Sequence, residues 1–400
     1  MKLKIELKST QKKKSGYLWQ EFIILTYMKF SKVQFFVLPF LTLLLVSNST
    51  CQEKNHTAKS QDDNRPNAQY AKNVILMIGD GMGTSQIYAG LVANKGHLHM
   101  EEFPITGFSK TSSADDFITD SAAGGTAMAT GTKTNNGMVG VDPEKDRVEN
   151  IIEIFEKDGK SSGLVATSTI THATPACFVA HVESRNDYEK IAMQFLETDI
   201  EVFIGGGAVH FKERLDQRDL TIDLAEKGYE LCYSMAELDT ATGDKIAGLV
   251  YESSPPSIKA GRGDMLSKAT KKAIEVLSKN ENGFFLMVEG SQIDWGNHQN
   301  NIQYQNLEVI DFDNVIGDAL QFAREDGETL VIVTADHETG GLGINGGNMA
   351  KGDVEPGFTT MGHTGVMVPV LAYGPQSELF SGIYENTEIF FKMLKALGKE

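Results

Sequence analysis

The sequence predicts an α/β fold: a three-layer sandwich in which a mainly parallel central sheet is flanked by helices. From residue 70 onward, short runs of β-branched and other apolar residues alternate with segments of helical pattern. These runs are continuously apolar rather than alternating, which is typical of strands that are buried on both faces. No internal repeat is visible, and we therefore expect residues 70–400 to form a single domain.

The predicted strands follow one another at 73–80, 162–169, 201–207, 284–290, 329–336 and 369–374. Helical patterns lie between them at 149–159, 265–279 and 307–326. The second of these helices has an apolar face and a lysine-rich face, as expected of a helix that packs on one side. Residues 208–262 are charged and mixed in pattern, and we predict a peripheral excursion there.

The first fifty residues differ in composition from the rest of the chain. They contain eight lysines and two acidic residues, a net charge of +6. Since the whole chain has a net charge of −17, residues 51–400 carry −23. The apolar run FFVLPFLTLLLV at 35–46 is too short to span a bilayer but suits the core of a signal peptide. We therefore predict an N-terminal extension and signal peptide over 1–50, with translation starting at Met1 or Met28, and export to the periplasm or beyond. The acidity of the remaining chain argues against a nucleic-acid partner.

The cleavage point of this signal has two alternatives. Cleavage after Ser49 or Thr50 would release a secreted protein, whereas cleavage directly before Cys51 would give an outer-membrane lipoprotein. A lipid anchor at Cys51 is the one membrane attachment that we expect. Residues 51–69 are polar and predict a flexible linker. Cys177 and Cys232 could pair or stay as buried thiols.

Potential metal ligands lie at the ends of four predicted strands. Asp80, Glu289 and Asp336 with His337 end three of them, and the strand at 162–169 leads to THATPA at 171–176. In open parallel sheets the carboxyl ends of the strands converge on the edge where ligands bind. A single Asp after a strand is usually a turn or a helix cap, but four such strand ends indicate a shared site.

Two further motifs add candidate ligands. In EGSQIDWGNH, Asp294 and His298 are four residues apart and would share one face of a helix that begins near Asp294. His363 lies between glycines in MGHTG. A surface contact would explain the Asp–His pair alone. The whole set of Asp, Glu and His without Cys suits zinc at the histidine-bearing positions and magnesium at an oxygen-rich one.

The stretch TDSAAGGTAMATG at 119–131 poses a separate question. A flexible linker is the simplest interpretation, but its alanines favour a helix. We expect Ser121 at the start of this helix, where backbone N–H groups and the helix dipole suit a phosphate. A serine N-cap is the alternative. No GxSxG elbow is apparent, so a metal is favoured over a histidine base as the activator of the hydroxyl.

These motifs make the chain similar to the alkaline phosphatases. ITDSAAGGT at 118–126 fits the nucleophile signature of that family, and GDGMG, THATPA, EGSQIDWGNH, TADHETGG and GHTG follow in the family's order. The resemblance implies an alkaline phosphatase-like fold from about residue 70 to the end, with residues 70–400 as the catalytic domain. It also implies hydrolysis of phosphate monoesters through a phosphoserine on Ser121, and a homodimer. Only 25 residues separate His337 from His363, so the large crown insertion of the vertebrate enzymes is missing.

The resemblance further implies a role for each motif residue. One zinc ion would be bound by Asp294, His298 and His363. A second zinc ion would be bound by Asp80, Asp336, His337 and the Ser121 oxygen. One magnesium ion would be bound by Asp80, Glu289 and Thr174, and His172 is counted among the residues of this metal site. Arg185 would bind the phosphate oxygens, with His172 and Trp295 beside them, although an ion pair of Arg185 with Asp187 or Glu183 is the alternative.

Some positions and alternatives stay open. His172 and Trp295 stand where the best-studied bacterial form has Asp and Lys, which bears on magnesium affinity, product release and pH optimum. Asp120 would either orient Arg185 or cap the helix. A phosphodiesterase or sulfatase of the same superfamily is disfavoured by the third metal site and by the absence of a Cys/Ser-x-Pro-x-Arg motif around Ser121. A surface lipoprotein that only binds phosphate or metal is disfavoured because no ligand is missing.

Overall fold

Strand β1 (Asn73–Gly79) is buried on both of its faces in this computed structural model, which describes residues 70–399. Val74 and Leu76 belong to one apolar cluster, whereas Ile75 and Met77 belong to another. Successive side chains of a strand point to opposite faces, so the two clusters are core layers on the two sides of the sheet. This explains the continuous apolar runs in the sequence.

Ten strands form the central sheet in the order β14-β2-β13-β8-β1-β7-β3-β4-β6-β5. Only β13 runs antiparallel to its neighbours, so the mainly parallel sheet predicted from the sequence is confirmed. The other strands of this sheet are β2 (Ile105–Lys110), β3 (Ser161–Thr169), β4 (Val202–Gly206), β5 (Glu230–Cys232), β6 (Ile246–Tyr251), β7 (Phe284–Gly290), β8 (Thr329–Thr334), β13 (Val368–Tyr373) and β14 (Gly382–Glu385). Two small sheets pair β9 (Glu338–Thr339) with β12 (His363–Thr364) and β10 (Gly343–Asn348) with β11 (Asp353–Gly357).

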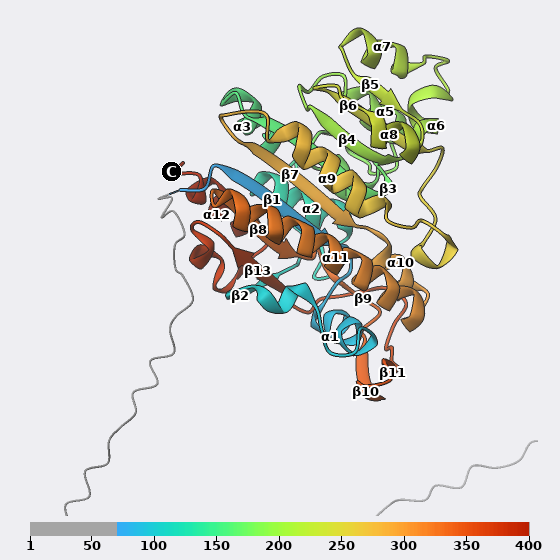
Figure 1. Ribbon diagram of the computed structural model, residues 1–400, viewed down its shortest axis with the longest axis vertical. Helices are drawn as coiled ribbons and strands as arrows, with labels where there is room; N and C mark the ends of the chain where they lie inside the picture. Colours follow the sequence, from blue (N-terminus) through green and yellow to red (C-terminus); the bar gives the residue numbers. More distant parts are fainter. Residues whose placement is uncertain (1–69, 400) are drawn as a thin grey trace, which may run out of the picture. The chain divides into compact units, whose positions relative to one another are not determined.

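Helices cover both faces of the sheet. The longest, α11 (Ile302–Asp326), lies with α9 (Met265–Leu277) across one face, and α2 (Ser121–Thr130), α3 (Ile151–Lys157) and α12 (Thr387–Ala396) pack on the other (Figure 1). The shorter helices are α1 (Thr84–Ala93), α4 (Ala173–Ala176), α5 (Tyr188–Gln194), α6 (Ala208–Lys212), α7 (Leu220–Glu226), α8 (Met235–Thr240), α10 (Gln292–His298), η1 (His99–Glu102), η2 (Ile258–Ala260) and η3 (Ser377–Phe380). The three-layer α/β sandwich is therefore as predicted.

The sequence predictions differ from the structure in a few places. The predicted helix at 307–326 begins earlier, at Ile302, because the Asn301 side chain caps it by accepting a hydrogen bond from the backbone N–H of Tyr304. Residues 208–262, predicted as a peripheral excursion, lie at one edge of the sheet but also contribute strands to it. Strands β6 and β5 from this region continue the central sheet beyond β4.

Several predictions concern residues outside the described part of the chain. These are the signal peptide over 1–50 with its start at Met28, the linker at 51–69 and the anchor at Cys51. Within residues 70–399, no helix combines the length and apolarity that crossing a bilayer requires. Cys177 and Cys232 are both buried free thiols.

Candidate functional site

The order of the strands brings the predicted ligands together. Strands β8, β1, β7 and β3 are neighbours in the sheet and run parallel, so their carboxyl ends lie side by side. Asp80 follows β1 directly, Glu289 is the penultimate residue of β7, and Asp336 lies two residues after β8. Thr174 is in α4, just after β3. The metal ligands predicted from the sequence gather here in three groups.

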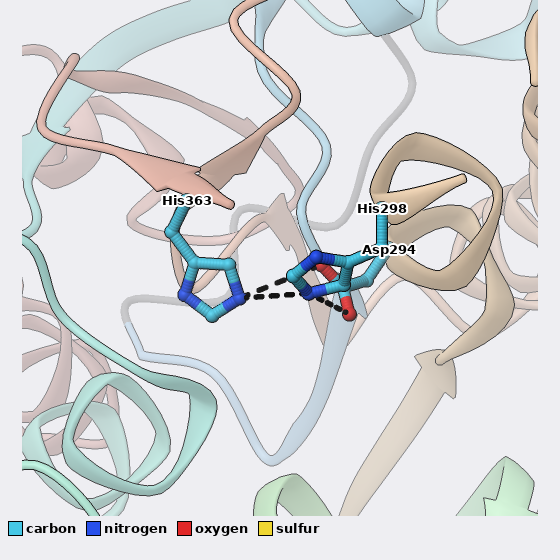
Figure 2. A group of neighbouring side chains, drawn as sticks. All are labelled: Asp294, His298 and His363. Carbon is cyan, nitrogen blue, oxygen red and sulfur yellow. Dashed lines mark hydrogen bonds and ion pairs between the residues drawn. The ribbon is translucent and has the colours of Figure 1, made fainter. Parts of the chain in front are cut away.

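Asp294, His298 and His363 form the first group (Figure 2). Asp294 and His298 are four residues apart on α10 and therefore share one face of that helix, whereas His363 comes from β12. Nε2 of His298 lies 3.2 Å from Oδ2 of Asp294 and 3.2 Å from Nε2 of His363. One atom from each residue lies within 4.8 Å of the others, so the three could bind one cation.

The tautomers of the two histidines suit such a cation. Nδ1 of His363 donates to the backbone oxygen of Thr119 at 2.8 Å, and Nδ1 of His298 donates to that of Met361 at 2.5 Å. A carbonyl oxygen can only accept, so in the neutral rings both Nε2 atoms carry lone pairs that face each other. The hydrogen bond with Asp294 raises the pKa of His298 to about 9.

Asp80, Asp336 and His337 form the second group, and all three are buried. Nε2 of His337 lies 3.3 Å from Oδ2 of Asp336 and 3.5 Å from Oδ1 of Asp80. The Oγ atom of Ser121 lies 3.3 Å from the same Nε2. The Ser121 hydroxyl is therefore next to any ion that this group binds.

Asp80, His172 and Glu289 form the third group, so Asp80 belongs to two groups. Burial raises the pKa of Glu289 to about 7, although the hydrogen bond that Oε2 accepts from the Ser291 hydroxyl at 2.7 Å partly opposes this. The buried Thr174 hydroxyl adds an uncharged oxygen to the group. This oxygen-rich set is of the kind that magnesium prefers.

The buried carboxylates present oxygens without a hydrogen-bond donor. Oδ1 of Asp336 accepts hydrogen bonds from the backbone N–H groups of Gly81 and His337, but its Oδ2 has no hydrogen-bond partner among residues 70–399. The same holds for both oxygens of Asp80 and for Oε1 of Glu289 within that range. Burial, followed by repulsion from neighbouring carboxylates, raises the pKa of Asp80 well above its ordinary value. A divalent cation would supply the missing partner, so the residues present fit metal ions.

Helix α2 carries Ser121 into this site. All ten of its residues are buried, so the stretch around 121–130 is a packed helix and not a linker. A Cβ on Gly124 would lie 3.0 Å from the Cβ of Asp336, and one on Gly125 would lie 3.0 Å from Sγ of Cys177. The two glycines therefore let the helix approach the end of β8 and the segment after β3.

Asp120 both caps α2 and holds Arg185. Its Oδ1 accepts a hydrogen bond from the Ala123 backbone N–H at 2.9 Å, and its Oδ2 lies 2.8 Å from Nη1 of Arg185 and 3.1 Å from the Gly137 backbone nitrogen. Burial tends to raise the pKa of Asp120, but these hydrogen bonds and the Arg185 charge outweigh it and lower the pKa. Both predicted roles of Asp120 are therefore present.

The other predicted contacts of Arg185 do not form. Asp187 pairs instead with Lys190 at 2.7 Å, and Glu183 pairs with Lys145 at 2.7 Å. Arg185 is thus free of both and points its guanidinium at the residue before Ser121.

His172 and Trp295 lie next to each other at the third group. Their rings meet edge to face with 6.1 Å between centroids. Burial, followed by the nearby Arg185 charge, lowers the pKa of His172 to about 4, so its ring is neutral at pH 7. A neutral imidazole can bind a metal ion or donate a hydrogen bond to an anion.

Two residues that sequence reasoning missed support the ligands. Glu338 is buried and accepts hydrogen bonds from Gln86 Nε2 at 2.6 Å and from the Thr364 hydroxyl, which ties β12 to β9. Thr339 pairs with His363 across these two strands. Their place within TADHETGG, directly after His337, was the only available signal.

Comparison with known proteins identifies the family. The alkaline phosphatase family model matches residues 71–353 and 348–399. The chain is 35% identical to alkaline phosphatase 4 of Bacillus subtilis over 439 residues, covering 86% of this chain and 92% of that protein. It is 34% identical to the alkaline phosphatase of Escherichia coli over 406 residues, covering 82% of this chain and 86% of that protein.

Solved structures agree with this comparison. The alkaline phosphatase of the Antarctic bacterium TAB5 has a TM-score of 0.79 and 44% identity, covering 82% of this chain and 99% of that one. A variant of the TAB5 enzyme with Mg bound in its M3 site has a TM-score of 0.78 and 42% identity, covering 83% of this chain and 99% of that one. By sequence and fold, the chain belongs to the alkaline phosphatase family and is a hydrolase of phosphate monoesters.

Proposed function

We propose that this chain hydrolyses phosphate monoesters through a covalent phosphoserine on Ser121, in a site that binds two zinc ions and one magnesium ion. The observation that carries this proposal is the position of the Ser121 hydroxyl, 3.3 Å from Nε2 of His337. That hydroxyl lies at the N-terminus of a buried ten-residue helix, next to carboxylate oxygens that lack donors.

The ligand sets follow the three groups. One zinc ion would be bound by Asp294, His298 and His363. The second would be bound by Asp80, Asp336, His337 and the Ser121 oxygen. The magnesium ion would be bound by Asp80, Glu289 and Thr174, with His172 next to it. When bound, these ions act as Lewis acids that make Ser121 a better nucleophile and stabilise negative charge on the leaving oxygen.

The chain's own residues bind and position the phosphoryl group. Arg185 presents a planar fork that suits two phosphate oxygens, and Asp120 holds that fork in place at 2.8 Å. The backbone N–H groups of the first residues of α2 would add hydrogen-bond donors for the same oxygens. His172 and Trp295, whose rings are in contact, would flank the phosphoryl group on the side of the third group of metal ligands.

The reaction then has two displacements at phosphorus. In the first, Ser121 Oγ loses its proton and forms a bond to phosphorus while the bond to the alcohol oxygen breaks, and that oxygen takes up a proton as the alcohol leaves. In the second, a water molecule loses a proton and attacks phosphorus, the bond to Ser121 Oγ breaks, Oγ takes up a proton again, and inorganic phosphate leaves. Arg185 stays bound to the phosphoryl oxygens in both steps, which stabilises their negative charge.

The test is Ser121→Ala, with Ser234→Ala as the matched control. Ser234 also lies at a helix start, where it caps α8 through the Glu237 N–H, but it lies outside the three groups of the site. We expect Ser121→Ala to lose most turnover and all acid-stable phosphate labelling, while it still binds zinc and inorganic phosphate. Ser234→Ala should keep both turnover and labelling. Wild-type turnover in Ser121→Ala would refute the phosphoserine.

Metal dependence needs its own measurement. Metal content and monoester turnover should be measured before chelation, after chelation, and after zinc and magnesium are restored. Turnover that survives complete removal of metal would contradict the proposed ligand sets. Parallel assays with a diester and a sulfate ester measure how strongly the site prefers monoesters.

We also propose, from the resemblance, that the protein is exported and forms a homodimer. A lipid anchor at Cys51 is one of the two outcomes of signal cleavage. Sedimentation of the purified protein tests the dimer, and detergent partitioning of Cys51→Ser against the unchanged protein tests the anchor.

A further inference from the structure

Thr339 lies between the first and second metal groups. Its hydroxyl donates to Oδ1 of Asp294 at 2.6 Å and lies 3.2 Å from Nδ1 of His337. The hydroxyl has one proton, and the ionised Asp294 carboxylate can only accept. Nδ1 of His337 must therefore donate to the Thr339 oxygen. One fully buried hydroxyl thus contacts a ligand from each of the two groups.

We propose that Thr339 is a positioning residue that couples the two zinc sites; this inference rests on the proposed function. By accepting from Nδ1, Thr339 keeps the proton of His337 away from Nε2, the atom that faces Asp336 and Ser121. By donating to Oδ1 of Asp294, it leaves Oδ2 directed at His298. Loss of the hydroxyl therefore affects both sites.

The surrounding backbone leaves this hydroxyl little freedom. Thr339 pairs with His363 between β9 and β12, so the third ligand of the first group is its direct strand neighbour. A Cβ on Gly81 would lie 2.8 Å from the Thr339 hydroxyl and 3.0 Å from Oδ1 of Asp294. Gly81 has a φ of +69°, and its bare backbone packs against the hydrogen bond between the two side chains.

Three variants separate the hydroxyl from its packing. Thr339→Val keeps the shape and removes the hydroxyl, whereas Thr339→Ser keeps the hydroxyl. Thr329→Val is the matched control. Thr329 is also fully buried, donates to Oδ2 of Asp326 at 2.6 Å and accepts from Nδ2 of Asn73 at 3.1 Å. It lies at the first residue of β8, at the opposite end of that strand from the site.

The readout is zinc affinity of the metal-stripped proteins, measured by competition with a chromophoric chelator that resolves two sites. We expect Thr339→Val to bind zinc about 10–100-fold more weakly at both sites, the usual effect of losing a hydrogen bond to a metal ligand. Thr339→Ser and Thr329→Val should match the wild type. Monoester turnover is measured on the same samples.

Each alternative result has a distinct meaning. Wild-type affinity in Thr339→Val, equal weakening in Thr329→Val, or failure of Thr339→Ser to restore binding would overturn the inference. Weakening at only one site would overturn the coupling. If the wild type binds zinc and hydrolyses monoesters but Thr339→Val has the same zinc affinity, the inference fails and the proposed function stands. If the wild type takes up no zinc, the inference and the proposed zinc sites both fail.

Discussion

Asp120 performs two tasks that substitution can separate. Its Oδ1 caps helix α2 through the Ala123 N–H, and its Oδ2 holds Arg185. Asn is as good an N-cap residue as Asp, whereas Ala is a poor one. Asp120→Asn therefore keeps the cap and removes the negative charge, and Asp120→Ala removes both.

The magnitudes follow from the geometry. Losing the cap costs about 1 kcal/mol. A hydrogen bond between charged groups is worth about 1.5–3 kcal/mol, but solvent screens this pair and reduces its contribution to about 1–2 kcal/mol. The Arg185 and Asp120 side chains are 22% and 20% exposed. We therefore expect the free energy of unfolding to fall by about 2–3 kcal/mol in Asp120→Ala and by about 1–2 kcal/mol in Asp120→Asn.

Two assays test this expectation. Urea unfolding of the metal-stripped variants measures stability, and competitive inhibition by inorganic phosphate measures how well Arg185 is positioned. Both variants should raise the phosphate inhibition constant about tenfold, which corresponds to about 1.4 kcal/mol. Asp219→Ala is the control, because Asp219 caps the remote helix α7 through the Thr221 N–H.

The reasoning fails in two recognisable ways. An unchanged phosphate inhibition constant in Asp120→Asn would mean that Asp120 only caps the helix. Equal destabilisation by Asn and Ala would mean that the cap contributes nothing separate from the charge. In Asp219→Ala, a raised phosphate inhibition constant would show that loss of any helix cap disturbs the site.

Three other substitutions address separate parts of the fold. Gly124→Ala places a Cβ 3.0 Å from the Cβ of Asp336, so we expect lower monoester turnover. This holds although Ala favours a helix over Gly by about 1 kcal/mol. Unchanged turnover would show that α2 has room to move. Burial raises the pKa of Glu156 to about 7 in the folded protein. The unfolded chain releases this proton near pH 4.5, so the free energy of unfolding falls as the pH rises from 4.5 to 7. Glu156→Gln should therefore be more stable than the wild type in urea at pH 8 and not at pH 5, and an equal gain at both pH values would contradict this cause. Arg262→Met leaves the buried Glu308 carboxylate without its cation, so we expect the free energy of unfolding in urea to fall by about 3–5 kcal/mol. An unchanged urea midpoint of unfolding would refute this expectation.

The ligands could be predicted because each is a charged or imidazole side chain in a short motif at a strand end. Asp80, Glu289 and Asp336 end continuous apolar runs, and that pattern alone places them at one edge of a parallel sheet. Their grouping depends on the order β8-β1-β7-β3, which is set by crossovers between distant strands. No local pattern encodes that order.

The supporting residues could not be predicted for a related reason. Asp120 meets Arg185 across 65 residues, and Thr339 meets Asp294 across 45. The strands that position Thr339 and His363 are two residues long, too short to show any periodicity. Strand β6 is apolar, but its flanks are mixed in pattern and hid it within 208–262.

The charge of the site links metal binding to stability. The chain carries a net charge of −17, and Asp80, Glu289, Asp294 and Asp336 place four buried carboxylates in one small volume. The three divalent ions of the proposed site would bring more positive charge than these four carboxylates cancel, so the loaded site would attract a phosphate despite the negative net charge of the chain. Without ions, the same carboxylates repel one another and destabilise the folded state. Metal ions that bind only the folded state remove this repulsion and therefore stabilise the folded state. We therefore expect the free energy of unfolding to rise by about 1.4 kcal/mol per site for each tenfold increase of free zinc above the dissociation constant. Urea titrations at several buffered zinc concentrations measure that slope, and a slope of zero would mean that these residues do not bind zinc in the folded state.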